Sequence, residues 1–271
     1  MACPLDRRGR MNAKSISVLK GLVLPSLLVV VWVALTSRHE SLLFPSPAKS
    51  VAATVDLWKT HSLQGYLVTS LRRYALGLLI GTSLGFIAGA ALGSSRILER
   101  FFLPNLHMFR QVPLVGWIPL LIIWCGQGDL SRVVLIAIGS FFPILMNTHA
   151  GFRQVPRSYL EVGEVFGFSR WEKLRRISLP AALPWIRTGS ILSLTFGWTI
   201  LVASELLTQA NGGLSDILDM GRERFRMELV NAGIVILGLL GFVFNLIATR
   251  VWSVGSLSWR SQNIHQTNEA G

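Results

Sequence analysis

Residues 158–180 read SYLEVGEVFGFSRWEKLRRISLP, a polar and basic stretch that contains two glycines. Long apolar runs flank it, in a chain of 271 residues that is 51% hydrophobic and 15% charged. A charged group that enters hydrocarbon without a partner is strongly destabilised. We therefore expect residues 158–180 to lie in water, between segments that cross a membrane.

Two Ser–Glu pairs in this stretch have the spacing of a helix N-terminus. Glu161 lies three residues after Ser158, and Glu172 lies three residues after Ser169. In such a capping box the hydroxyl and the carboxylate each bond a backbone N–H that the first turn leaves free. The pattern predicts two short helices, which begin near Ser158 and Ser169.

The residues that end these helices are also present. Gly167 favours the left-handed conformation that closes a helix, and Pro180 is expected to stop the second helix because it has no N–H. The resulting helix-turn-helix is tethered between apolar runs, and a basic helix pair is weak support for DNA recognition. We interpret it as a docking element for a protein on the aqueous side.

The same stretch resembles a known signature. Its spacing is similar to the E-A-A-x3-G-x9-I-x-L-P pattern of the inner-membrane permeases of binding-protein-dependent ABC importers, although Val162 and Gly163 replace the two alanines. The matching positions are Glu161, Val162, Gly163, Gly167, Ile177, Leu179 and Pro180. The resemblance implies that these residues form coupling helices that dock on a separate ATPase. ATP and Mg²⁺ would then be bound by that partner, and this chain would bind no cofactor.

Six apolar runs are long enough to cross a bilayer, which takes about 20 helical residues. Two of them contain several prolines or glycines, which membrane helices tolerate where neighbours satisfy the freed backbone groups. The runs are Val18–Thr36, Tyr74–Gly93, Pro104–Cys125, Arg132–Thr148, Pro184–Leu207 and Leu229–Val251. We predict an all-α polytopic membrane protein with six transmembrane helices, and the resemblance implies a type I ABC importer permease fold.

The predicted domain organisation follows from these runs. Residues 1–17 form an N-terminal tail, residues 18–251 form the permease domain with its coupling loop at 153–183, and residues 252–271 form a C-terminal tail. With both tails on the cytoplasmic side, 16 of the 26 Lys and Arg residues fall in cytoplasmic segments. The positive-inside rule therefore predicts an N-in, C-in protein of the bacterial inner membrane. This topology also accounts for the net charge of +12 without nucleic acid as a partner.

Glycines recur at every fourth position along the second apolar run. The stripe consists of Gly77, Gly81, Gly85, Gly89 and Gly93. Small residues on one helix face allow a neighbouring backbone to approach closely, and helices associate in lipid largely through such packing. The stripe therefore predicts close packing against a helix of the same chain or, alternatively, the seam between two permease subunits.

Polar residues inside the apolar runs are candidates for function. Arg110 and Gln111 lie in the third run, in a segment that resembles the R-x-x-P stretch of the sulfonate, nitrate and taurine branch of the family. These two residues are candidates for an anion translocation pathway. The alternative for Arg110 is a structural ion pair with Glu205, or a position at the membrane interface.

Glu205 lies near the outer end of the fifth run. It resembles the Ala-Glu dipeptide that in the family precedes a Gly-rich turn, here at Gly212 and Gly213. These three residues are candidates for an outer gate or for a contact with a solute-binding protein. No pattern of a metal site, a phosphate-binding loop or a hydrolase nucleophile occurs in the chain, so we do not expect an enzyme.

The resemblance extends from about Ser70 to Arg250 and is closest to the aliphatic sulfonate permeases. It implies one membrane subunit of an ATP-driven importer for a small anion, paired with a second copy, two ATPases and an external solute-binding protein. Importers of nitrate, taurine, bicarbonate or a pyrimidine precursor are close alternatives. Two other classes stay open: an ATP-independent channel or carrier with a regulatory loop, and a membrane enzyme.

Overall fold

The computed structural model describes residues 23, 26–37, 44–60, 62–208 and 212–254, which form helices joined by short turns. The predicted tails at 1–17 and 252–271 therefore lie outside the described residues, apart from 252–254. The chain divides into two compact units, residues 1–62 with 217–234 and residues 63–216 with 235–271. Each unit is described by itself.

The first unit contains a short apolar helix at Ser26–Ser37 and α2 at Pro47–Lys59. Ser46 caps α2, because its hydroxyl accepts a hydrogen bond from the Lys49 N–H. Most of α10 (Asp216–Glu223) and the first turns of α11 (Met227–Val254) complete the unit. These two helices pack closely, since a Cβ added at Gly221 would lie 2.7 Å from a methyl group of Val230.

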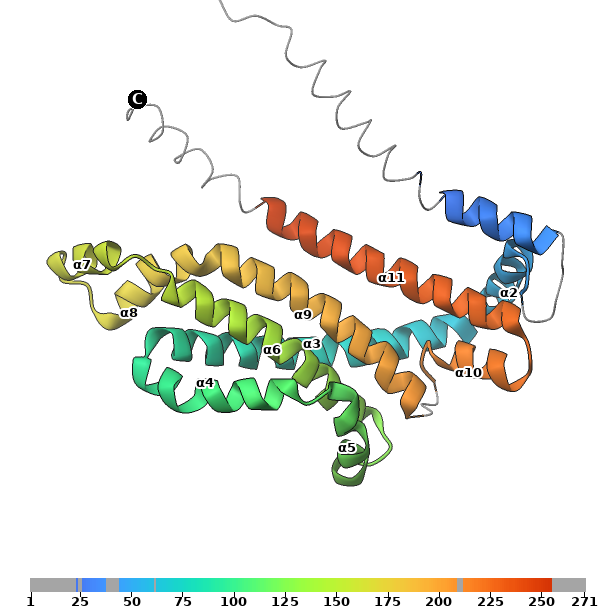
Figure 1. Ribbon diagram of the computed structural model, residues 1–271, viewed down its shortest axis with the longest axis horizontal. Coiled ribbons are helices and arrows are strands. Elements are labelled where there is room, and N and C mark those ends of the chain that lie inside the picture. The colour runs from blue at the N-terminus through green and yellow to red at the C-terminus, as the bar shows by residue number, and fades with distance from the viewer. Residues whose placement is uncertain (1–22, 24–25, 38–43, 61, 209–211, 255–271) are drawn as a thin grey trace, which may run out of the picture. The chain divides into compact units, whose positions relative to one another are not determined.

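Three long helices form the centre of the second unit: α3 (Ser62–Ser94), α6 (Asp129–Arg153) and α9 (Leu179–Leu207). Helix α6 packs along α9 (Figure 1). The later part of α11 joins them through an aromatic cluster, in which the Phe244 ring lies 5.2 Å from Tyr74 and 5.0 Å from Trp198. The Tyr74 hydroxyl donates a hydrogen bond to the Leu194 carbonyl at 2.8 Å.

The glycine stripe of α3 faces α6. A Cβ at Gly85 would lie 2.5 Å from Ile144 Cγ2 and from the Phe141 carbonyl, and one at Gly89 would lie 2.6 Å from the Leu145 carbonyl. These distances leave no space for a second polypeptide at the stripe. The arrangement agrees with the first of the two interpretations, packing within one chain.

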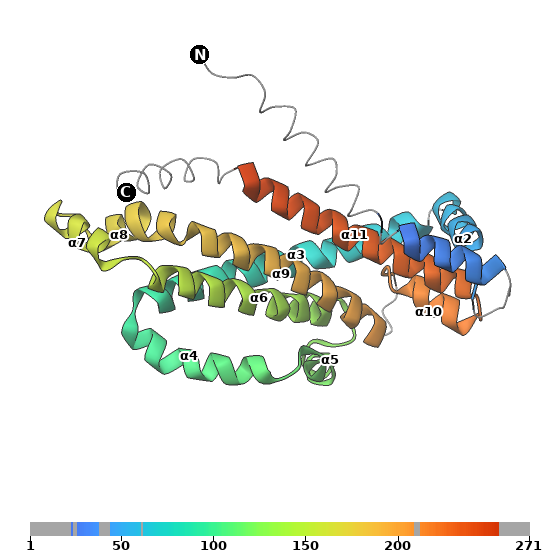
Figure 2. The same cartoon turned by 45° about the horizontal axis from the view of Figure 1, so that its top comes forward.

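The third predicted span, Pro104–Cys125, consists of two helices with a sharp bend between them. Helix α4 (Arg96–Gln111) ends within the predicted span. A short 3-10 turn (Leu114–Trp117) then leads into α5 (Ile118–Cys125), and the segment Leu114–Cys125 is bent by 89° relative to α4. Figure 2 shows this change of direction. The cause is Pro113, which excludes the residue before it from the helical region; Val112 accordingly has φ −71° and ψ 122°.

Four helices of the described part are long and apolar enough to cross a membrane, and the bent α4–α5 pair makes five if it counts as one span. The first predicted span, Val18–Thr36, lies partly outside the described residues, and Ser26–Ser37 is shorter than a span requires. The count of six therefore stays a prediction. Helix α3 begins at Ser62, well before the predicted Tyr74, so it includes Arg72 and Arg73.

Candidate functional site

Residues 157–178, here called the coupling hairpin, contain α7 (Arg157–Val165) and α8 (Arg170–Lys173). Gly167 has φ +69°, as the sequence predicted for the residue that closes the first helix. The Phe168 N–H bonds the Gly163 carbonyl at 2.8 Å, and the Gly167 N–H bonds the Glu164 carbonyl at 2.9 Å. This is a Schellman motif, and it sets the turn between the two helices.

One of the two predicted capping boxes is present. Ser169 and Glu172 bond each other's backbone N–H groups, at 3.0 and 3.3 Å. The box at Ser158 and Glu161 is wrong, because α7 begins at Arg157 and its N-cap is Pro156. Proline fixes the extended backbone before the helix, so the start moves upstream and Ser158 lies inside the first turn.

Pro180 does not end the second helix, contrary to the sequence prediction. The chain is helical from Arg170 to Leu207, with a π-helical turn at Leu174–Ser178. The Leu179 N–H bonds the Leu174 carbonyl, five residues back. This wider turn relieves the clash that proline makes with the carbonyl four residues back, so the helix continues through Pro180. Helix α8 is therefore in direct helical continuity with α9.

The signature residues hold the hairpin together. Gly163 is buried against Ile177, whose Cδ1 would lie 2.7 Å from a Cβ at that position. An alanine there would gain helix propensity of up to about 1 kcal/mol but would have to displace the flexible end of Ile177. Lys173 Nζ donates a hydrogen bond to Glu164 Oε1 at 2.8 Å and holds the pKa of that carboxyl below its usual range.

The base of the coupling hairpin is anchored in the core. Leu174 and Leu179 pack against a buried cluster contributed by α6 and α9, which consists of Ile144, Phe152, Ala182 and Ile186. The outer face of the hairpin is different: Val165 is 87% exposed, Phe166 72% and Trp171 67%. Glu161 and Val162 are exposed beside them. An apolar face of this kind on a water-facing loop is typical of a protein-binding surface.

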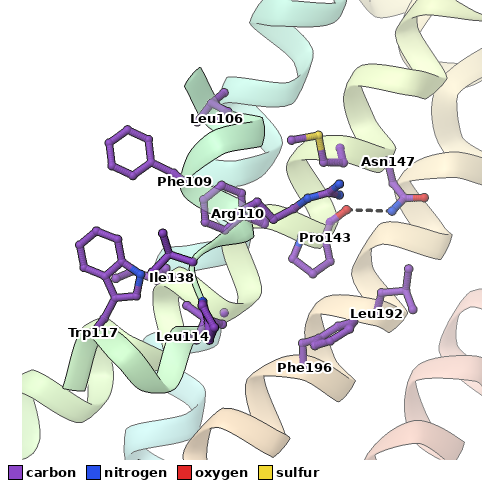
Figure 3. A pocket seen from close by; sticks show the side chains of 15 residues that line it. Leu106, Phe109, Arg110, Leu114, Trp117, Ile138, Pro143, Asn147, Leu192 and Phe196 are labelled. Carbon is purple, nitrogen blue, oxygen red and sulfur yellow. Dashed lines mark hydrogen bonds between the residues drawn. The ribbon is translucent and has the colours of Figure 1, made fainter. Parts of the chain in front are cut away.

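A cavity of about 550 Å³ lies among α4, the α4–α5 bend, α6 and α9. Arg110 lines it, and Figure 3 shows its guanidinium directed toward the Pro143–Asn147 segment of α6. Asn147 Nδ2 donates a hydrogen bond to the Pro143 carbonyl at 2.8 Å. Gln111 is not among the lining residues, so the structure brings only one of the two predicted pathway residues to the cavity.

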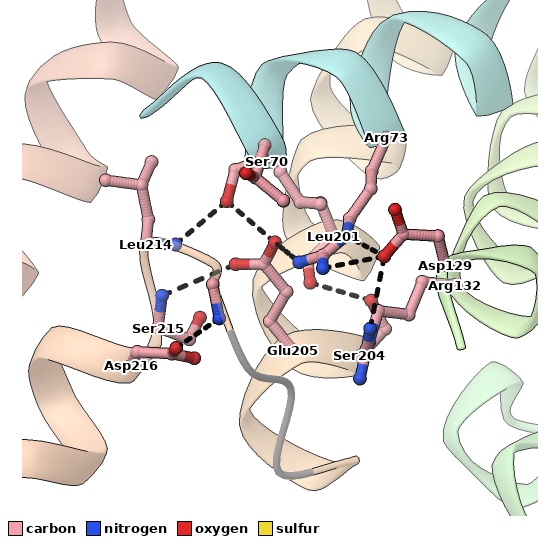
Figure 4. Close-up of polar contacts among 12 residues, drawn as sticks. Ser70, Arg73, Asp129, Arg132, Leu201, Ser204, Glu205, Leu214, Ser215 and Asp216 are labelled. Carbon is pink, nitrogen blue, oxygen red and sulfur yellow. Dashed lines mark hydrogen bonds and ion pairs between the residues drawn. The ribbon is translucent and has the colours of Figure 1, made fainter. Parts of the chain in front are cut away.

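The alternative that Arg110 pairs with Glu205 is wrong. Glu205 is 1% exposed, and its Oε1 accepts hydrogen bonds from Arg73 Nη1 at 2.9 Å and from the Ser70 hydroxyl at 2.7 Å. Burial of a carboxylate requires such partners, and both come from α3. Figure 4 shows Glu205 between these side chains and the turn that leads to α10.

The turn after α9 is fixed by the same carboxylate. The Ser215 N–H bonds Glu205 Oε2 at 3.3 Å, and the Leu214 N–H bonds the Ser70 hydroxyl at 2.8 Å. A Cβ at Gly213 would lie 2.6 Å from the Glu205 carboxylate, which explains the glycine there. Glu205 is buried, and its predicted role at an outer gate or at a surface for a solute-binding protein stays a prediction. It can act only through the turn that it holds.

Asp129, the first residue of α6, extends the network. It accepts hydrogen bonds from Arg73 Nε at 2.8 Å and from Arg72 Nη2 at 2.5 Å, and Arg132 Nη1 lies 3.5 Å away. Arg132 also bonds the Thr208 hydroxyl at 2.9 Å. The sequence prediction did not single out Ser70, Arg73, Asp129 or Arg132 as functional or structural candidates. The sequence contains one signal for this network: Arg72, Arg73, Asp129 and Arg132 lie next to the ends of apolar runs, where charged side chains can meet.

This fold, with its coupling hairpin and its helical bundle, defines a membrane-embedded transport component. Residues 81–252 match the family model of the binding-protein-dependent transport system inner membrane component. The chain therefore belongs to this family of ABC importer permeases. It follows that the protein is an inner membrane component of a transporter, not an enzyme, and that ATP hydrolysis occurs in a separate subunit.

Several relatives are similar over most of the chain. SsuC of Bacillus subtilis (strain 168), which carries the name of an aliphatic sulfonates transport permease protein, is 34% identical over 256 residues, covering 94% of this chain and 92% of SsuC. The taurine transport system permease protein TauC of Escherichia coli (strain K12) is 30% identical over 249 residues, covering 90% of this chain and 87% of TauC.

A solved structure has the same fold. The MetNI methionine ABC transporter in an inward-facing conformation matches with a TM-score of 0.59 at 20% identity, covering 70% of this chain and 94% of the matched chain. The predicted type I importer permease fold is thereby confirmed.

Proposed function

We propose that this chain is the permease subunit of an ATP-driven importer that carries a small organic anion, with aliphatic sulfonates as its substrates, into the cytoplasm. The names of the similar relatives, sulfonate and taurine permeases, support this substrate class. The positive charge that Arg110 contributes to the cavity supports an anion. The partners are a cytoplasmic ATPase, an external solute-binding protein and a second copy of the permease, in an N-in, C-in arrangement.

The observation that carries the proposal is the coupling hairpin. Its exposed apolar face, with Val165, Phe166 and Trp171, offers a surface for the ATPase. Its second helix continues without a break into α9, and Leu174 and Leu179 are packed in the core. A displacement of the hairpin is therefore passed to the bundle through a continuous helix. Such a stiff connection is what the bundle needs in order to switch between two arrangements of its helices.

The experiment reconstitutes the full chain in vesicles with the partner ATPase and the partner solute-binding protein. Uptake of radiolabelled butanesulfonate is measured with ATP, with a non-hydrolysable analogue, and without the ATPase. We expect uptake only when both the ATPase and hydrolysable ATP are present. Competition by taurine and by nitrate then ranks the preference of the transporter for these anions. Uptake that needs neither ATP nor the second subunit would identify a passive carrier and refute the proposal.

Disruption of the exposed face tests the coupling step. Val165→Asp places a charge in the apolar surface, and we expect loss of ATPase binding and of uptake with normal membrane insertion. Arg224→Gln, an exposed change on a different segment, is the matched control and leaves both unchanged. Normal ATPase binding by Val165→Asp would exclude this face as the docking surface.

A further inference from the structure

The cavity beside Arg110 combines one positively charged side chain with a mostly apolar lining. Of the 15 residues that line it, Arg110 is the only ionisable one, and no carboxylate is among them. Within the described part of the chain, no ion pair or hydrogen bond engages the Arg110 guanidinium. A guanidinium carries five N–H donors in a fork that matches the oxygens of a carboxylate, phosphate or sulfonate. The cavity therefore presents one uncommitted anion-binding group.

The remaining walls are almost entirely apolar. Leu192 and Phe196 of α9 face the cavity from the side opposite α4, and Leu114 and Trp117 line it from the α4–α5 bend (Figure 3). Asn147 adds one amide, which is already bonded to the Pro143 carbonyl. A bare inorganic anion would find only the Arg110 guanidinium here, because the walls offer it almost no other polar group. An anion with a hydrocarbon chain matches both parts of the cavity.

We propose that this cavity is a selectivity site within the permease itself. The anionic head of an organic solute binds the Arg110 guanidinium, and its alkyl chain lies along Leu192 and Phe196. The chain then selects alkylated anions over inorganic ones, in addition to any selection by the binding protein. This inference rests on the proposed transport function and assigns a specificity role to Arg110 together with Leu192 and Phe196.

Binding to the full chain, held in lipid nanodiscs with its ATPase and without the binding protein, tests the proposal. Radiolabelled butanesulfonate is the probe, with ethanesulfonate, hexanesulfonate and nitrate as competitors. We expect saturable binding whose affinity rises about fourfold for each added methylene, the value for burial of one CH₂ group. Nitrate should compete more weakly than any of the three sulfonates.

Matched variants separate the two ends of the site. Arg110→Gln should weaken butanesulfonate binding at least about tenfold, as expected for loss of a charge-assisted contact. Arg100→Gln, an exposed arginine of the same helix outside the cavity, should leave binding unchanged. Phe196→Ala should flatten the dependence on chain length, whereas Phe242→Ala, on exposed α11 surface, should not. Arg110→Lys keeps the charge and should restore most of the binding if Arg110→Gln fails to assemble.

Three results would overturn the inference: equal binding by the Arg110→Gln and Arg100→Gln variants, competition by nitrate as strong as by hexanesulfonate, or no saturable binding to the wild-type chain. If binding is absent while ATP-driven uptake is normal, only the selectivity site fails and the transport function stands. If binding is present while uptake needs no ATP, the transport proposal fails instead.

Discussion

In the described part of the protein, the buried charged side chains are those of Arg73, Arg132 and Glu205. Each has an oppositely charged or hydrogen-bonding partner, because an unpaired buried charge would be strongly destabilising. Glu205 also binds the backbone after α9. One side chain therefore links α3, α9 and the start of the turn toward α10.

Removal of Glu205 should be among the most destabilising single changes in the chain. Glu205→Ala takes from the Arg73 guanidinium one of its two carboxylate partners, since Asp129 remains. It also removes the carboxylate that accepts from the Ser70 hydroxyl and the Ser215 N–H. We expect a loss of about 3–5 kcal/mol in the free energy of unfolding, as is typical when one member of a buried ion pair is removed. Thermal denaturation of the purified protein in detergent measures the loss as a lower Tm.

Glu223→Ala provides the control for Glu205→Ala. Glu223 lies exposed on α10, and an exposed substitution of this kind changes stability by less than about 0.5 kcal/mol. If the two variants melt at the same temperature, the buried network does not stabilise the protein.

The Glu164–Lys173 contact should make the coupling hairpin sensitive to acid. The pKa of Glu164 is lowered by the Lys173 hydrogen bond, so the folded hairpin favours the ionised carboxyl. Its stabilising effect is therefore present at neutral pH and is lost as the pH falls through and below the ordinary carboxyl range, near about 4. We expect faster amide hydrogen exchange in α7 for Glu164→Gln than for wild type at pH 7, and no difference in acid. A difference that is the same at both pH values would contradict this assignment.

At the scale of elements, the close contact between α3 and α6 depends on the absence of side chains. The glycines of the stripe lie so near the α6 backbone that a methyl group would force the helices apart. Helix propensity alone would favour alanine at each of these positions by about 1 kcal/mol. Packing therefore outweighs propensity along this face.

Two Gly→Ala changes in the same helix should have opposite effects. Gly85→Ala puts a methyl 2.5 Å from Ile144 Cγ2 and from the Phe141 carbonyl, and we expect a cost of about 1–3 kcal/mol. Gly65→Ala meets no atom within 4 Å and should be neutral or stabilising by up to about 1 kcal/mol. Thermal denaturation of both variants measures the difference. Stabilisation of both variants to a similar extent would show that helix propensity, not packing, decides their effect.

For the whole molecule, the distribution of Lys and Arg predicts the side of the membrane on which each loop lies. Single cysteines at Arg170 and Glu223, in a background with Cys3→Ser and Cys125→Ser, test this topology. A membrane-impermeant maleimide should label the Glu223→Cys variant in intact cells and the Arg170→Cys variant only after permeabilisation. The reverse pattern would place the coupling hairpin outside and exclude contact with a cytoplasmic ATPase.

The helical class, the coupling hairpin and its left-handed Gly167 were predictable because they depend on local patterns of hydrophobicity and turn chemistry. Prolines and glycines indicated an interruption of the third span, but the full change of direction was not predicted. A proline in a membrane helix is compatible with both a kink and such a change. Continuation through Pro180 was missed for a similar reason, since the π-turn that permits it has no sequence pattern of its own.

The sequence by itself determined that the chain is a helical membrane permease with a water-facing hairpin, because composition and short-range spacing carry that information. Only the tertiary structure decided which partner each buried charge has, since Arg73 and Glu205 are 132 residues apart. It also decided that the glycine stripe faces α6 and that Arg110 lines a cavity without a carboxylate. These features depend on how distant helices meet, and hydrophobic periodicity along one segment does not specify that.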